Sequence, residues 1–193
     1  MRVRKAKKED GSSIAELILL AMREIVYSFI GSEDIKEAYG FIFFLVQQDE
    51  NQYSYTNTWV VEEDGQIIAS LTGYEGSKLD QLRQPVLDLL KQQYNRILLP
   101  EKETGKGEFY IDTLSVDTAH QGRGLGTKLL HHLTKEIVQK EGKTIGLLVD
   151  IKNPRAKKLY TKIGFKVVGQ KQFLDHQHEH LQLSKEDLSY SSF

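Results

Sequence analysis

The chain has 193 residues, enough for one domain with a sizeable hydrophobic core and too few for two. Its 26 basic and 27 acidic side chains nearly cancel, so no global charge favours nucleic acid or a membrane surface as a partner. The absence of cysteine excludes disulfides, thiolate catalysis and cysteine zinc sites, and is typical of the reducing cytoplasm. The longest apolar run, residues 41–46, is too short to cross a bilayer, and the N-terminus lacks the apolar core of a signal peptide. We therefore expect a single cytoplasmic domain over residues 1–193.

The N-terminal part of the chain is predicted to form a strand followed by two helices. Residues 2–7 alternate apolar and basic side chains, which favours a short strand. A helix-start pattern at residues 9–12 precedes apolar residues at helical spacing. Ser32 is expected to cap a second helix that ends near Gln48.

A hairpin and an inserted helix are predicted next. Residues 58–62 and 66–74 are expected strands, joined by a turn in which Gly65 supplies a positive φ. Residues 77–99 carry apolar side chains at helical spacing and precede a charged loop at 101–106. One expectation is that this helix packs on the sheet edge or forms a dimer contact. The alternative is that it acts as a lid that shapes a substrate site.

A glycine-rich turn then lies between a predicted strand at 108–116 and a helix whose apolar positions run from 129 to 137. Glycines let consecutive backbone N–H groups point one way, and the helix N-terminus adds partial positive charge, so the turn predicts an anion site. Arg123 adds a full positive charge. The spacing matches neither a P-loop nor a Rossmann fingerprint. The residues of the turn are Gln121, Gly122, Arg123, Gly124, Leu125, Gly126 and Thr127.

A second segment follows a similar strand-to-helix plan. Residues 144–151 form a continuous apolar run, as expected for a strand inside a sheet. Asn153 followed by Pro154 is the pattern of an N-cap and a first helical residue. Apolar side chains between 156 and 163 then share one helix face, and Gly164 is placed to end the helix.

The two segments together resemble the GNAT superfamily of acetyl-CoA-dependent N-acetyltransferases. Residues 121–126 match its Q-x-x-G-x-G phosphate motif, and residues 153–165 match its N-x-x-A-x-x-L-Y-x-x-x-G-F cofactor segment. The resemblance implies an α/β fold: a mixed, mostly antiparallel sheet of seven strands, splayed between strands 4 and 5, with helices on both faces.

The resemblance also implies how acetyl-CoA is held. The turn at 121–127 is expected to bind the pyrophosphate, while the backbone of the fourth strand pairs with the pantetheine arm and the acetyl oxygen. The matching positions are Leu114, Ser115 and Val116, with the N–H of Leu114 nearest the acetyl oxygen, where it acts as an oxyanion-hole donor. Asn153 is expected to bond the pantetheine arm, although its N-cap role would equally explain it.

Catalysis requires loss of a proton from the acceptor amine, which costs about 4–5 kcal/mol at pH 7 for a lysine-like group. By resemblance, Asp112 is the candidate base or water relay; its alternative roles are to anchor the substrate ammonium or to cap a loop. Strand alternation places Tyr110 and Asp112 on the side of Leu114. Leu148 stands where some protein N-terminal acetyltransferases carry a glutamate. Tyr160 matches the family's general acid; the alternative is a core tyrosine.

Alternating histidines at 176, 178 and 180, next to Asp175 and Glu179, raise a metal site as one interpretation. The family needs no metal, so we expect a solvated or acceptor-facing strand instead.

The combined expectation is transfer of the acetyl group of acetyl-CoA to a primary amine of a small molecule in a direct ternary complex, because no cysteine is available for a covalent intermediate. Two alternatives stay open. One is a protein or peptide N-terminal or lysine acetyltransferase, and the other is a non-catalytic CoA-binding sensor. The resemblance also raises a homodimer, since dimers are common in the family.

Overall fold

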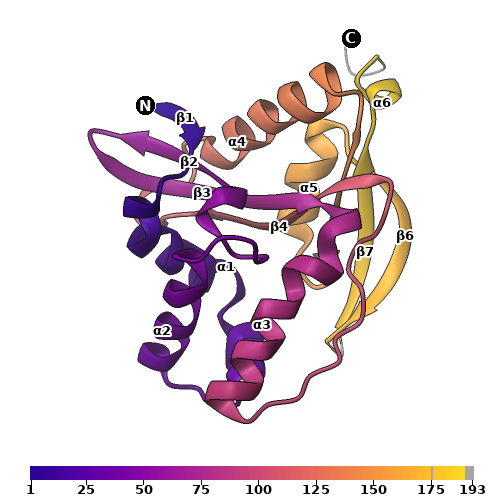
Figure 1. Cartoon of the computed structure of the whole chain (residues 1–193). Helices are drawn as coiled ribbons and strands as arrows, with labels where there is room; N and C mark the ends of the chain where they lie inside the picture. Colours follow the sequence, from indigo (N-terminus) through magenta and orange to yellow (C-terminus); the bar gives the residue numbers. More distant parts are fainter. Residues whose placement is uncertain (175, 190–193) are drawn as a thin grey trace. The chain divides into compact units, whose positions relative to one another are not determined.

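The computed structural model describes residues 1–174 and 176–189. Seven strands form one mixed sheet in the order β1-β2-β3-β4-β5-β7-β6 (Figure 1). Strands β4 and β5 are parallel, the other neighbours are antiparallel, and helices cover both faces, so the expected fold class is confirmed. The strands are β1 (Arg2–Lys5), β2 (Thr58–Glu63), β3 (Gln66–Glu75), β4 (Glu108–Val116), β5 (Thr144–Asp150), β6 (Lys166–Phe173) and β7 (His176–Leu183). The helices are α1 (Gly11–Ile30), α2 (Ile35–Val46), α3 (Leu79–Tyr94), α4 (Leu125–Leu133), α5 (Pro154–Ile163) and α6 (Lys185–Ser189).

The parallel ladder between β4 and β5 begins at Glu108↔Thr144 and ends at Ile111↔Leu147. Strand β4 then continues to Val116, and β5 stays paired with β7 as far as Asp150.

Contacts within the chain divide it into two compact units. Unit 1 comprises Met1–Gly73, Asp80–Leu99 and Thr113–Leu129, and unit 2 comprises Tyr74–Leu79, Pro100–Asp112 and Leu130–Phe193. The boundaries fall inside β3, α3, β4 and α4, so each of these elements contributes residues to both units.

In unit 1, α1 and α2 lie side by side (Figure 1) and bury apolar side chains such as Ile14, Ile18 and Phe41. Helix α2 is capped by Asp34, whose carboxylate accepts from the Lys36 amide at 2.7 Å. The expected cap, Ser32, instead accepts a hydrogen bond from the Asp34 amide. The cap prediction was therefore wrong by two positions, because the hydroxyl serves the turn before the helix.

The inserted helix is shorter than expected. Helix α3 ends at Tyr94 rather than near residue 99, because Asn95 adopts a left-handed φ of 51° and the Arg96 amide donates to the Leu90 carbonyl. Ile97, beyond this end, is 77% exposed. The apolar face of the helix is nevertheless buried within the chain, as expected for a packed helix. Its buried side chains are Leu79, Leu82, Val86, Leu89 and Leu90.

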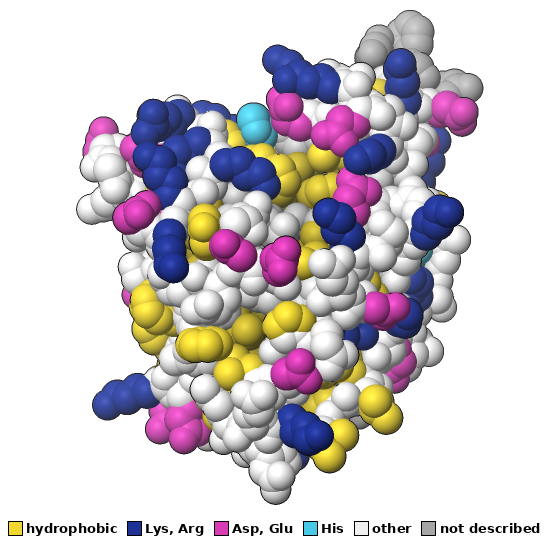
Figure 2. Space-filling view, in the orientation of Figure 1, with side chains coloured by type: hydrophobic (Ala, Val, Ile, Leu, Met, Phe, Trp, Pro, Cys, Tyr) yellow, Lys and Arg dark blue, Asp and Glu magenta, His cyan; other side chains and the backbone are white. Residues whose placement is uncertain are grey.

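The charged side chains of both signs are mixed on the surface. On the face in Figure 2, basic and acidic side chains are interspersed. Within residues 1–174 and 176–189, no helix combines the length and the apolar character needed to cross a membrane.

Candidate active site

The glycine-rich turn lies directly between β4 and α4 in unit 1. Gly122 and Gly124 have φ values of 79° and 76°, a region that other residues adopt only with strain. A Cβ at either glycine would meet nothing within 4 Å, so the backbone there borders open space. The Lys128 amide donates to the Gly124 carbonyl at 3.0 Å, which starts α4 and leaves the amides of its first turn without intrahelical acceptors. The backbone geometry of the turn thus fits the predicted anion site.

The side chains that flank the turn are held in place. Gln121 donates from Nε2 to the Val116 carbonyl at 3.3 Å, which ties the turn to the end of β4. Arg123 donates two hydrogen bonds, at 2.8 and 2.9 Å, to the Glu63 carboxylate at the β2–β3 hairpin. The bonds from Arg123 hold the pKa of Glu63 below its usual value. The guanidinium charge is therefore balanced within the protein.

The predicted acetyl-binding positions occupy the end of β4 that leads into this turn. Leu114 and Val116 are half-buried and Ser115 is buried. All three belong to unit 1, as do residues 121–127. The other predicted site residues, Asp112, Asn153 and Tyr160, belong to unit 2.

In unit 2, Asp112 is half-buried and accepts a hydrogen bond from Tyr74 of β3. The distance between Tyr74 Oη and Asp112 Oδ2 is 2.8 Å. The Tyr74 ring also lies against the Tyr110 ring, with centroids 5.9 Å apart. Tyr110 and Asp112 therefore share one face of β4, as the alternation predicted. Tyr74 itself was missed by sequence reasoning, because no local pattern pairs residues 38 positions apart.

The charged loop between α3 and β4 contacts Tyr74 and Lys171 in the same unit. Glu103 is only 4% exposed, and its Oε1 lies 3.5 Å from Tyr74 Oη. The Glu103 carbonyl accepts from Lys171 Nζ at 2.9 Å. Gly76 allows the loop to approach, because a Cβ there would collide with the Gly105 carbonyl and the Thr104 hydroxyl. The loop thus contributes a buried carboxylate, Glu103, beside the Tyr74 hydroxyl.

A second buried carboxylate begins β4. Glu108 accepts hydrogen bonds from His180 Nε2 at 2.8 Å, Gln182 Nε2 at 2.7 Å and Thr104 Oγ1 at 2.7 Å. Burial raises the pKa of this carboxyl, but the three hydrogen bonds and the charge on His180 more than offset it, so the pKa lies below its usual value. Glu108 is therefore ionised at neutral pH.

The remaining histidines of β7 are separately engaged. His176 Nδ1 lies 3.3 Å from Asp150 Oδ2, and the His178 ring contacts Phe173 with centroids 6.1 Å apart. Among the described residues, no cluster of three or more histidine or acidic side chains is arranged to hold a metal ion. Asp175, named in the metal interpretation, lies outside the described residues.

The second cofactor segment is built locally as predicted. The Asn153 Oδ1 accepts from the Ala156 amide at 3.0 Å, Pro154 opens α5, and Gly164 ends it with φ 115°. Tyr160 is half-buried and its ring lies edge-on to Phe165 at 5.8 Å. Burial raises the pKa of the Tyr160 phenol to about 12, so it stays protonated throughout the neutral range.

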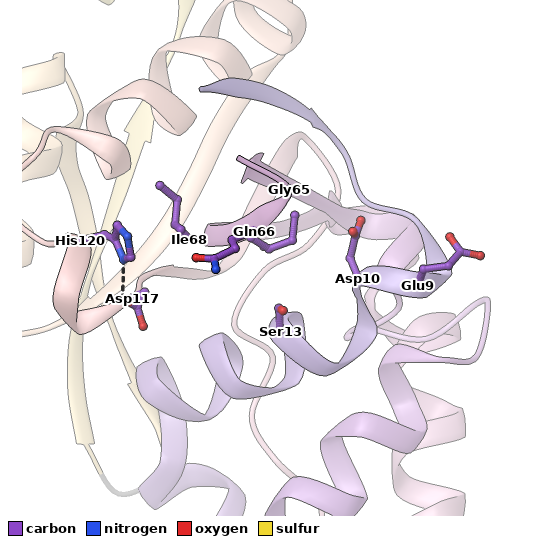
Figure 3. A pocket seen from close by; sticks show the side chains of 9 residues that line it. Glu9, Asp10, Ser13, Gly65, Gln66, Ile68, Asp117 and His120 are labelled. Atoms are coloured by element: carbon purple, nitrogen blue, oxygen red, sulfur yellow. Dashed lines mark hydrogen bonds and ion pairs between the residues drawn. The ribbon is translucent and has the colours of Figure 1, made fainter. Parts of the chain in front are cut away.

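Unit 1 also carries an open pocket of about 390 Å³ between the start of α1, β3 and the β4–α4 connection (Figure 3). Two of its three carboxylates are engaged: Asp10 with Arg4 at 2.6 Å, and Asp117 with His120 at 2.6 Å. None of the predicted site residues lines it.

The two segments that carry the family resemblance, residues 121–127 and 153–165, thus each have the local geometry predicted for them. Residues 27–165 match the model of the acetyltransferase (GNAT) family, and the chain belongs to this family. Acetyl-CoA is the acetyl donor of GNAT-fold acetyltransferases.

Individual relatives agree with this assignment. An N-acetyltransferase from Staphylococcus aureus Mu50 is 25% identical, with a TM-score of 0.80 over 95% of this chain and 100% of that chain. Another solved acetyltransferase is 30% identical, with a TM-score of 0.78 over 95% of this chain and 99% of that chain. Mycothiol acetyltransferases from two Mycobacterium strains are 42% identical over 65 residues, which covers 32% of this chain and 21% of each relative. The match therefore spans about a fifth of the length of these curated relatives.

Proposed function

We propose that this protein transfers the acetyl group of acetyl-CoA to a primary amine of a small molecule in a direct ternary complex. One observation carries the proposal: strand β4 bears a half-buried carboxylate at Asp112 and leads directly into the anion-binding turn at 121–127. A cofactor-binding turn and a candidate proton acceptor on one strand are what acetyl transfer to an amine requires.

The residues of the turn fit the donor. The positive φ values at Gly122 and Gly124 and the open space beside them suit a pyrophosphate that backbone amides bind. Leu114, Ser115 and Val116 would hold the pantetheine arm through their backbone, with the Leu114 amide toward the acetyl oxygen, and Asn153 would assist. Acetyl-CoA, when bound, supplies an activated thioester. The sequence contains no cysteine, so direct transfer to the amine is favoured over a cysteine-bound acyl group.

Asp112 would attract the ammonium of the acceptor and receive its proton, directly or through water. A carboxylate beside the amine lowers the cost of removing a proton that is otherwise held with a pKa near 10.4. The Tyr74 hydroxyl donates a hydrogen bond to Asp112 Oδ2 at 2.8 Å, which supports a carboxylate held in a defined position.

Tyr160 would donate a hydrogen bond to the departing sulfur. A phenol with a pKa of about 12 is a weaker acid than a thiol with a pKa near 8.5, so complete proton transfer is unfavourable by about 5 kcal/mol. The proposed role is therefore stabilisation of the developing negative charge by a hydrogen bond.

Two points support a small acceptor over a protein. Leu148 of β5 is apolar, whereas some protein N-terminal acetyltransferases carry a glutamate at the matching position. The curated relatives are named for mycothiol rather than for a protein.

The test is release of free CoA thiol from acetyl-CoA across a panel of amines, amino acids and peptides at mildly alkaline pH. Wild type, Tyr160→Phe and Asp112→Asn are compared, with Tyr94→Phe as a control because Tyr94 packs against Phe41 on α2 and is not one of the proposed site residues. Release that depends on a small amine and falls at least about tenfold in the first two variants supports the proposal. Release only with peptides favours the protein-directed alternative. Acetyl-CoA binding without release favours a sensor.

A further inference from the structure

The Asp112 carboxylate is oriented by a side chain with no other assigned role. Tyr74 is only 3% exposed, and its ring is confined by the Tyr110 ring at an interplanar angle of 56°. Its hydroxyl oxygen lies 2.8 Å from Asp112 Oδ2. A buried phenol packed against another ring restricts the positions open to the carboxylate it binds.

The direction of this hydrogen bond follows from the two distances at Tyr74 Oη. Glu103 Oε1 lies 3.5 Å from the same oxygen, whereas Asp112 Oδ2 lies at 2.8 Å. A phenol has one proton, and the shorter contact receives it. The Asp112 carboxylate therefore accepts a hydrogen bond that favours its ionised form.

We propose that Tyr74 is a positioning residue for the acetyl transfer: its hydroxyl orients the Asp112 carboxylate and keeps it ionised, ready to meet the ammonium of the acceptor. The inference rests on the role proposed above for Asp112. Tyr74 acts through Asp112 and needs no contact with the substrate.

Other charged groups on this side of unit 2 contribute to the local field. They come from the loop before β4, from β4 itself and from strands β6 and β7, and their own hydrogen bonds link several of them together. These groups are Glu103, Glu108, Tyr110, Lys171 and His180.

The test is the pH profile of the acetyl transfer in Tyr74→Phe, combined with a carboxyl ¹³C NMR titration of Asp112 in the unliganded protein. Loss of one hydrogen bond to the charged form is expected to move both the acid limb of the profile and the Asp112 titration upward by about 1 pH unit. The KM for acetyl-CoA is expected to stay unchanged. Tyr94→Phe, which removes a hydroxyl from another aromatic pair, is expected to match wild type. Replacing Tyr74 with 3,5-difluorotyrosine, a stronger donor, should move both midpoints downward.

The outcomes separate this inference from the proposed function. Midpoints that do not move in Tyr74→Phe, while Asp112→Asn abolishes activity, overturn the role of Tyr74 alone. Full activity in Asp112→Asn overturns the role of Asp112 and this inference with it. A lowered melting temperature in Tyr74→Phe with an unmoved Asp112 titration indicates a purely structural tyrosine and also overturns the inference.

Discussion

The carboxylate of Glu108 on β4 occupies the space directly beside Gly146 on β5, where a Cβ would overlap it. The two residues are not opposite each other, because Gly146 pairs with Tyr110 in the parallel ladder. Glu108 thus leans along the strand to reach His180 and Gln182 on β7. The missing side chain at 146 is what makes room for this buried carboxylate.

Gly146→Ala is expected to destabilise the protein by about 2–4 kcal/mol, because the methyl group would displace Glu108 from its donors. Urea unfolding measures the change. Gly169→Ala on β6 is the matched control, since a Cβ there meets nothing within 4 Å, and it is expected to have little effect. Equal effects of the two substitutions would contradict the packing argument.

Glu108→Gln tests the same network through pH. The hydrogen bonds of Glu108 lower its pKa in the folded protein. The ionised side chain therefore adds its full share to the free energy of unfolding above the unfolded pKa, which is near 4.3. This stabilisation is lost as the pH falls through the lower pKa of the folded state. At neutral pH we expect the variant to be less stable by about 1–3 kcal/mol. Below about pH 4 the difference from wild type should shrink. Glu136→Gln, which removes an exposed partner of Lys140, should show little difference at any pH.

Gly124→Ala is expected to weaken acetyl-CoA binding at least about tenfold, measured by isothermal titration calorimetry, because both the left-handed turn and the approach of a phosphate are disturbed. Gly142→Ala is the control for strain alone: Gly142 has a φ of 68° and equally open surroundings outside the turn. Each should lose about 1–2 kcal/mol of stability. A similar loss of acetyl-CoA binding in both variants would contradict the assignment of the turn to the cofactor site.

Glu63→Gln should release Arg123 from its bidentate pair and make it available to an incoming phosphate. We expect acetyl-CoA to bind about two- to fivefold more tightly, the range typical of an exposed ion pair, and the affinity to fall more steeply with salt. Glu62→Gln on the same hairpin, whose partners are Arg2 and Arg4, serves as the control. Weaker binding in Glu63→Gln would show that Glu63 positions Arg123 instead.

Features that depend on neighbours in the chain were predictable. The Asn153 cap, the Gly164 helix end and the Gly65 turn follow from hydrogen bonds and backbone angles that span a few residues. The same locality explains why the strand at 108–116 was predicted with the correct bounds, whereas residues 125–127 of the predicted turn belong to α4. Residue type and spacing are sufficient when the interacting atoms lie within one turn or one strand.

The contacts that shape the candidate site depend instead on pairings across the sheet. Tyr74 reaches Asp112 from 38 residues away, and Glu108 meets His180 from 72 residues away. Which side chains meet depends on the register between strands, and register is set by burial over the whole sheet rather than by any local pattern. For the same reason the loop that follows α3, predicted only as charged, buries Glu103 beside Tyr74: packing against Gly76 and Lys171 determines its path.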